Sequence, residues 1–349
     1  MGRLRENKMV NKKIHIIGKN NELLEQLCKE QSEKLDVLSH EDLNEEIKES
    51  FLTKIVFLTE AENYAGTLKS IRQKRKDIFL VGFDQTSGLS GKDQYVHGLN
   101  LLKETSSNLV YSYDDKTEIS MIIAPEETKY HETKDQEETL KNLVEMAYLR
   151  SHLTFTRSTV IAGEPVSWNS ELVPEALRTV INYCIKQGAY KTFRGSTVGH
   201  FAAKLDEKTF LTSRRKTNFN DLDKIGLVKI VTDGPDSVLA YGSKPSVGGQ
   251  SQRIIFGQNQ KYNCIVHFHS PKKKNSLVPA VSQREYECGS HECGKNTAQG
   301  LKKFGNLSAV YLDNHGPNIV FHSSINSQEV INFIEENFDL AKKTGGYVE

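Results

Sequence analysis

The chain has 349 residues, of which 37% are hydrophobic and 26% are charged. At about 100–200 residues per domain, this length predicts two domains or one large one. Lysine and arginine number 46 against 45 acidic residues, so bulk charge argues against binding to nucleic acid or to an anionic membrane. No apolar run reaches the length of about 18 residues that a transmembrane helix needs. Five scattered cysteines suit no disulfide framework, and together these features predict a cytoplasmic globular protein.

The first half alternates between strand-like and helical segments. Strand candidates lie at residues 13–17, 54–59, 77–83, 108–113 and 119–124. Residues 20–31 show leucines at helical spacing, and residues 132–150 form a charged helix with one apolar face. Alternation of this kind predicts a small α/β domain with a parallel sheet over residues 12–150.

The second half begins after a change in pattern. Residues 151–170 lose the helical period and contain Gly163, Pro165 and Trp168, so we predict a linker there. Residues 172–186 then form an amphipathic helix, and strand candidates follow at 200–205, 209–212, 227–231, 253–256, 263–269 and 307–312. Helices are expected within 285–304 and at 327–343. These elements predict a second α/β domain over residues 171–343.

The most informative segment is Asn263 to Ser270, with the sequence NCIVHFHS. In a strand, alternate side chains share a face, so His267 and His269 project together. His315 follows an apolar strand on a polar turn and is a candidate third ligand. Three histidines with an open fourth position are typical of catalytic zinc. The alternative is that both rings of the H-x-H pair are hydrogen-bonded at a sheet surface without a metal.

Five short motifs of the second half occur in an order that resembles the class II aldolase/adducin family. They are GHFA at 199–202, FLTSRRKTNFNDL at 210–222, KPS at 244–246, VHFHSP at 266–271 and NHG at 314–316. The resemblance implies an α/β/α domain in which His267, His269 and His315 bind a divalent metal, most often zinc. It also implies a small anionic substrate and a homo-oligomer, with a tetramer favoured.

The chain departs from the family at several positions that carry chemistry. The glutamate of the family motif KPSSE corresponds to Gly248, which cannot transfer a proton. The places where the family binds a substrate phosphate hold His200, Ser246 and a basic run. That run, Arg214, Arg215 and Lys216, is predicted to hold a larger or more highly charged anion. The alternative is a solvated basic loop.

Two further residues are candidates for the missing acid–base role. Glu287 lies in a segment at 282–295 that is dense in functional side chains, and it is our first choice. The same segment contains Cys288, His291 and Cys293, whose spacing offers an alternative soft metal site. Tyr347 is the second candidate, because the resemblance implies that a tail tyrosine reaches the site of a neighbouring subunit.

Residues 76–146 resemble the C-terminal part of phosphopantothenate–cysteine ligase. The matching runs are FLVGFD at 79–84, NLV at 108–110 and MIIAPEE at 121–127. The resemblance implies a Rossmann-like fold and a nucleotide-activated carboxylate. However, Asp84-Gln85-Thr86 replaces A-A-E of the family, and Gly18 is the lone glycine where a phosphate loop is expected. We therefore predict a truncated domain kept for regulation, ligand binding or assembly.

Together these features predict a metal-dependent lyase of the aldolase type that acts on a small anionic carbonyl compound. The first alternative is a non-catalytic binding or scaffold protein with an adducin-like head, which the glycine at position 248 favours. The second alternative is a role in the coenzyme A pathway through the first domain.

Overall fold

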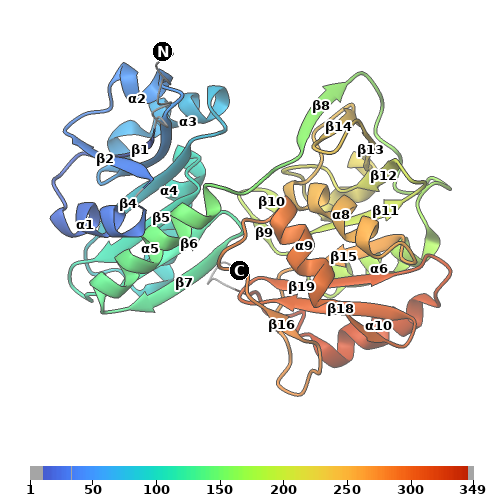
Figure 1. Cartoon of the computed structure of the whole chain (residues 1–349). Helices are drawn as coiled ribbons and strands as arrows, with labels where there is room; N and C mark the ends of the chain where they lie inside the picture. The colour runs from blue at the N-terminus through green and yellow to red at the C-terminus, as the bar shows by residue number, and fades with distance from the viewer. Residues whose placement is uncertain (1–10, 33, 345–349) are drawn as a thin grey trace, which may run out of the picture. The chain divides into compact units, whose positions relative to one another are not determined.

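The computed structural model describes residues 11–32 and 34–344 (Figure 1). It consists of two compact units. The first runs to Pro125 and resumes over Lys129–His152, and the second takes in Glu126–Thr128 and the chain from Leu153. Both units are α/β, which confirms the predicted fold class. All five cysteines are free. In the described residues, no helix has the length and apolar character needed to cross a membrane.

The first unit is built on a seven-stranded sheet in the described part of the chain, in the order β2-β1-β3-β4-β5-β6-β7. Strands β1 to β5 are parallel to their neighbours, and β6 is antiparallel to β5. Its elements are β1 (Lys12–Ile17), α1 (Glu22–Gln31), β2 (Leu35–His40), α2 (Glu45–Glu49), β3 (Thr53–Leu58), the 3-10 helix η1 (Ala61–Tyr64), α3 (Ala65–Lys74), β4 (Phe79–Thr86), α4 (Gly91–Thr105), β5 (Leu109–Asp114), β6 (Ser120–Ala124), β7 (Thr128–Thr133) and α5 (Gln136–Arg150).

Helices cover both faces of this sheet. Apolar residues of α1 and α5 form one core with Ile55, Phe57 and Val81 of the central strands. Helix α4 packs against β4, β5 and β6 on the opposite face of the sheet, because alternate residues of a strand point to opposite faces. Side chains cap free N–H groups at the start of α1, α2, α4 and α5, as Ser90 does for α4.

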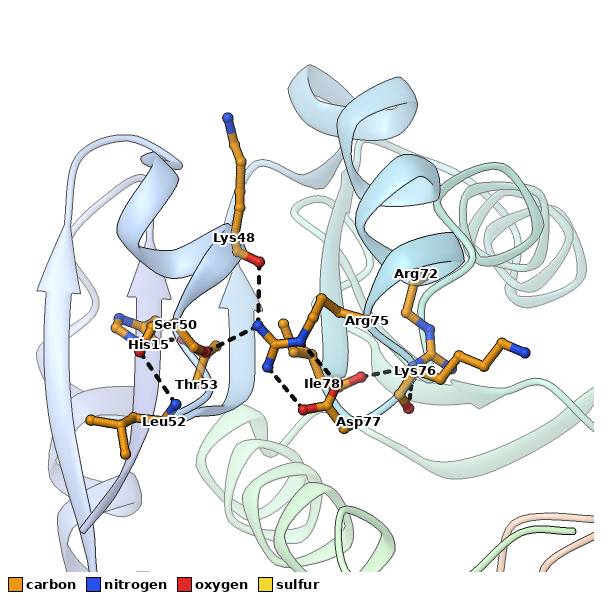
Figure 2. A network of polar contacts seen from close by, with 10 residues as sticks. All are labelled: His15, Lys48, Ser50, Leu52, Thr53, Arg72, Arg75, Lys76, Asp77 and Ile78. Atoms are coloured by element: carbon orange, nitrogen blue, oxygen red, sulfur yellow. Dashed lines mark hydrogen bonds and ion pairs between the residues drawn. The ribbon is translucent and has the colours of Figure 1, made fainter. Parts of the chain in front are cut away.

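Arg75 ties together the loops that precede β3 and β4 (Figure 2). Its guanidinium group donates two hydrogen bonds to the carboxylate of Asp77, at 3.0 and 2.8 Å, and another to the carbonyl of Ser50 at 3.0 Å. Arg72 donates at 2.8 Å to the carbonyl of Ile78 just before β4. These bonds satisfy carbonyl groups that the sheet itself leaves open, so the network has a structural role.

The second unit is built on a ten-stranded, mainly antiparallel sheet in the described residues. Nine strands follow the order β16-β18-β19-β15-β11-β12-β13-β14-β8, and β17 pairs with β18. The elements are β8 (Arg157–Ile161), α6 (Glu175–Lys186), β9 (Thr192–Phe193), β10 (Ser196–Thr197), β11 (His200–Lys204), β12 (Thr209–Thr212), η2 (Phe219–Asp221), α7 (Leu222–Ile225), β13 (Val228–Thr232), β14 (Ser237–Tyr241), α8 (Val247–Gln258), β15 (Cys264–His267), β16 (Ala280–Val281), α9 (His291–Gly300), β17 (Lys302–Phe304), β18 (Leu307–Leu312), β19 (Gly316–Phe321) and α10 (Ser327–Asn337).

Two apolar layers hold this sheet between helices. The core on one face joins α6 and α10 to Phe201 and Val266. The core on the other face joins α8 and α9 to Ala202 and Ile265, the next residues along the same strands. The central strands β11 and β15 are therefore buried on both faces, and their ends lie in the interior of the unit.

Two expectations for individual segments are changed by the structure. The predicted strand at 253–256 is wrong, because these residues belong to helix α8, where Ile255 and Phe256 pack beneath the sheet. A short apolar run has no period that distinguishes a buried helix from a strand. Within 151–170, residues Arg157–Ile161 form β8, which extends the sheet as a parallel neighbour of β14.

Candidate metal centre

Three histidines meet at the end of the central strands of the second unit. His267 is the last residue of β15, His269 follows two positions later, and His315 immediately precedes β19. Their residues are 0%, 5% and 1% exposed. Gly316 permits this meeting, because a Cβ atom there would lie 2.1 Å from the carbonyl oxygen of Phe268. Asn314 adopts a left-handed conformation, with φ of 55°, which asparagine tolerates better than most residues.

The three rings face one another through their Nε2 atoms. Nε2 of His315 lies 3.2 Å from Nε2 of His267 and 3.0 Å from Nε2 of His269. Nδ1 of His267 is 2.8 Å from the carbonyl oxygen of Pro317. A carbonyl only accepts, so Nδ1 of His267 carries the proton and its Nε2 presents a lone pair to the centre. This second contact is the one that orients metal-binding histidines in proteins.

Burial keeps the imidazoles of His267 and His269 neutral. It lowers the pKa of His267 from 6.5 to about 4, against a smaller raising effect of the hydrogen bond to Pro317. Burial also lowers the pKa of His269 well below its usual value, and the charges of His315, His267 and Lys343 add to that effect. Neutral imidazoles with converging lone pairs are the form that binds a divalent metal. The donor set therefore fits a metal ion.

Two polar atoms beside the histidines have no hydrogen-bond partner among the described residues. They are the side-chain oxygen of Asn318, which pairs with His267 across the sheet, and the hydroxyl of Ser270. Asn318 is 2% exposed and Ser270 is fully buried. Buried polar atoms are almost always satisfied in folded proteins. Their presence here indicates a site shaped for a polar ligand rather than for packing, and neither residue was predicted from the sequence.

His200 is the fourth imidazole of the site. It pairs with His267 across β11 and β15, and the two rings stack with centroids 4.5 Å apart. Nδ1 of His200 lies 2.5 Å from Nε2 of Gln252, whose side-chain oxygen accepts from the hydroxyl of Thr212 at 3.2 Å. An amide nitrogen only donates, so Nδ1 of His200 is an acceptor and its proton is on Nε2. Gln252 was not predicted as a site residue, because its contact with His200 joins positions 52 residues apart in the chain.

The predicted basic run divides into two parts. The Arg214 guanidinium group donates from one terminal nitrogen at 2.7 Å to the carbonyl of Ile225, which supports the loop, while its buried Nε has no hydrogen-bond partner among the described residues. Lys216 is exposed, and Arg215 is exposed as a residue although its guanidinium group is partly desolvated. The backbone of this loop is held beside 244–246, because N–H of Arg215 donates to the carbonyl of Lys244 and N–H of Ser246 donates to the carbonyl of Ser213. The structure thus brings the basic run and Ser246 together.

Glu287 lies near Arg215. Partial burial lowers the pKa of the Arg215 guanidinium, and the charge of Glu287 opposes that shift. The proposed cysteine–histidine metal site is not formed. Nε2 of His291 is 2.9 Å from the hydroxyl of Thr156, whereas Cys293 contacts Gln283. In the described residues, these side chains do not gather into a group of three metal ligands.

The C-terminal segment of the described chain closes one side of the centre. The N–H of Thr344 donates to the carbonyl of His269 at 3.1 Å, and its hydroxyl donates to the carbonyl of His315. The preceding Lys343 pairs with Glu127 at 2.5 Å, and both side chains are only 4% exposed. Glu127 belongs to the second unit through the segment Glu126–Thr128. Tyr347, a predicted catalytic residue, lies outside the described residues.

Comparison with known proteins agrees with this geometry. Residues 179–275 match the family model for the class II aldolase and adducin N-terminal domain. The predicted resemblance to this family is thereby confirmed over residues 179–275. The match includes His267 and His269 and ends before His315. No curated protein matches the chain.

Several solved structures are similar to parts of the chain. YgbL from Escherichia coli is 21% identical, covers 47% of this chain and 83% of its own, and gives a TM-score of 0.35. L-fuculose 1-phosphate aldolase is 16% identical over 48% of this chain and 85% of its own, also with a TM-score of 0.35. The DNA/pantothenate metabolism flavoprotein from Streptococcus pneumoniae is 10% identical over 40% of this chain and all of its own, with a TM-score of 0.30.

Proposed function

We propose that the second unit is a metal-dependent lyase of the aldolase type that acts on a small anionic carbonyl compound. The convergence of three buried imidazoles on one point carries the proposal, because three histidines with an open position are the ligand set of a catalytic metal site. His267, His269 and His315 would hold a divalent ion, most readily zinc. When bound, such an ion polarises a carbonyl group and stabilises an enediolate.

The surrounding residues support an anionic substrate. Arg215 and Lys216 are charged, exposed and held beside Ser246, so they can bind a phosphate or carboxylate group. Nε2–H of His200 is a neutral donor next to His267 and can bind a substrate oxygen. We assign Arg214 to support of the loop. The site therefore combines the cations of Arg215 and Lys216 with the neutral Nε2–H donor of His200.

We propose that Glu287 transfers the proton and that Tyr347 assists it. A carboxylate is a competent base, and Gly248 at the family's usual position is not. Exchanging Glu287 for glutamine should remove proton transfer while metal binding persists, whereas Glu285→Gln, two residues away, should retain both. A Glu287→Gln enzyme with full activity would exclude this role.

The first experiment follows deuterium exchange at the carbon beside the carbonyl group. The purified chain, loaded with zinc, is incubated in D₂O with dihydroxyacetone phosphate or pyruvate and observed by proton NMR. Exchange that stops on chelation and returns with zinc supports the proposal. Exchange that is unaffected by complete metal removal contradicts it, as does a chain that takes up no zinc at all.

A non-catalytic binding domain is the second candidate function, and Gly248 is the observation that favours it. It predicts stoichiometric zinc without exchange or cleavage of any small anionic carbonyl compound. We further propose a cytoplasmic homo-oligomer, a tetramer in particular, which light scattering at micromolar concentration would test. A monomer at that concentration would contradict this assembly.

A further inference from the structure

The first unit contains a second group of metal-binding side chains, separate from the histidine centre. Ligand atoms of Glu62, Asp84 and His97 all lie within 4.8 Å of one another. We propose that these three residues bind a divalent transition metal, zinc in particular. This proposal is independent of the proposed function, because all three residues belong to the first unit.

The three side chains come from three different elements at one edge of the sheet. Glu62 lies in η1 directly after β3, Asp84 lies near the end of β4, and His97 lies in α4. Leu58 at the end of β3 pairs with Gly82, so Asp84 extends beyond its neighbour. The carboxyl ends of parallel strands are the usual place for ligands in α/β sheets.

The group is negatively charged and lacks a fixed positive partner. Asp84 has a fully buried side chain, whose oxygens accept from Ser112 at 3.0 Å and contact Nδ1 of His97 at 2.9 Å. Among the residues that the structure describes, no lysine or arginine forms an ion pair with Glu62 or Asp84. Two carboxylates this close repel each other, and a bound cation removes that cost.

A simple hydrogen-bonded pair of Asp84 and His97 explains only part of this arrangement. It accounts for one carboxylate and leaves the approach of Glu62 unexplained. The carboxylate of Glu62 comes close to Asp84 and His97, with ligand atoms of all three within 4.8 Å of one another, and forms no bond in that pair. Helix α4 is also held very close to the strand, since a Cβ at Gly98 would lie 2.5 Å from Ile123 and 3.2 Å from Oδ2 of Asp84.

The donor set indicates the class of metal. Two carboxylate oxygens and one imidazole nitrogen suit zinc and other first-row transition metals, whereas magnesium and calcium prefer oxygen ligands alone. The nitrogen–oxygen separation of 2.9 Å between His97 and Asp84 requires only a small expansion to admit an ion. Glu62 and His97 are exposed, so the ion has a direct route from solvent.

The test is a zinc titration of the full metal-free chain by calorimetry, with the metal content checked by mass spectrometry. The unaltered chain should bind about two zinc ions, one at each cluster, as sites with preformed ligands do. Glu62→Gln, a change at an exposed side chain, should weaken one binding event by at least about tenfold. Excess magnesium should leave that event in place. The matched control is Glu60→Gln, because Glu60 lies two residues away and pairs with Lys19.

Each outcome decides the question. Loss of one event in Glu62→Gln and Asp84→Asn, with both retained in Glu60→Gln, supports the site. A single event in the unaltered chain that disappears in His269→Ala overturns it. So does a second event that Glu62→Gln and Asp84→Asn leave unchanged, or that Glu60→Gln weakens equally. If Asp84→Asn fails to fold, judged by circular dichroism, Glu62→Gln alone remains decisive.

Discussion

Each of the two units holds one cluster of possible metal ligands, and the two clusters differ in burial and in charge. The histidine centre of the second unit is almost fully buried and uses uncharged rings. The cluster of Glu62, Asp84 and His97 keeps two of its three residues at the surface. Neutral imidazoles can be buried at modest cost. In the second cluster the buried ligand is the carboxylate of Asp84, which Ser112 and His97 contact, while Glu62 and His97 face solvent. The cost of burial is therefore offset by neutral rings in one cluster and by hydrogen bonds to a carboxylate in the other.

Of the substitutions considered, loss of His315 should have the largest effect on metal binding and activity. A small effect would show that the histidine centre does not act as a metal site. His315→Ala removes the ring that contacts both other histidines, so metal and lyase activity should fall by more than about 100-fold. Metal analysis and the exchange assay measure the two effects. The matched control is His322→Ala, because His322 is exposed and bonds to Ser324.

Gly316→Ala should destabilise the second unit by about 1–3 kcal/mol, since an added methyl group would meet the carbonyl of Phe268. Urea unfolding followed by the fluorescence of Trp168, the one tryptophan, reports on this unit. Gly257→Ala in α8 is the control, because nothing lies within 4 Å of its added Cβ. Equal effects of the two substitutions would show that the close approach at Gly316 has no energetic role.

Without metal, the contributions of His267 and Asp84 to folding stability should change with pH in opposite directions. The pKa of His267 is lowered from 6.5 to about 4, so the unfolded chain binds the proton more readily and stability is lost as pH falls through this window. The pKa of Asp84 is raised, so its unfavourable contribution appears as pH rises above 3.8.

Unfolding at a series of pH values separates the two contributions. Asp84→Asn should stabilise the metal-free first unit at neutral pH, and the effect should vanish in acid. The same variant should leave the acid sensitivity of Trp168 fluorescence unchanged. A first unit that is less stable at neutral pH without Asp84 would show that the carboxylate is favourable there, which contradicts the expected sign.

Gln252→Leu should have the smallest effect. It removes the donor to Nδ1 of His200, so the ring is free to change tautomer, and substrate affinity should fall by about tenfold. Gln252→Glu should have the opposite effect on the ring. An ionised carboxylate can only accept a hydrogen bond, so it would favour the tautomer of His200 with the proton on Nδ1. Nitrogen NMR of the histidine rings reports the tautomer directly. An Nε2–H tautomer in all three proteins would refute the role of Gln252.

The sequence was sufficient where a local pattern determines the geometry. The strand at 209–212 is observed as predicted, whereas the strand predicted at 263–269 ends at His267 and leaves His269 beyond it. The histidines at 267, 269 and 315 nevertheless lie together. Contacts that depend on distant pairing were not accessible. Asn318 reaches the site because β19 pairs with β15, and Glu127 reaches Lys343 across 216 positions. Arg214 has the same charge as Arg215, yet only the folded loop shows that one of its guanidinium nitrogens is bonded to the carbonyl of Ile225.

The position of the histidines in the topology also fixes when the centre can form during folding. His267 and His269 are neighbours in the chain, so even an unfolded chain can offer two ligands to an ion. His315 joins them only after β19 has paired with β15, a contact that spans 48 residues. An ion bound early by His267 and His269 would gain its third ligand only when β19 pairs with β15. The time course of tight metal binding during refolding would therefore report when these two strands pair.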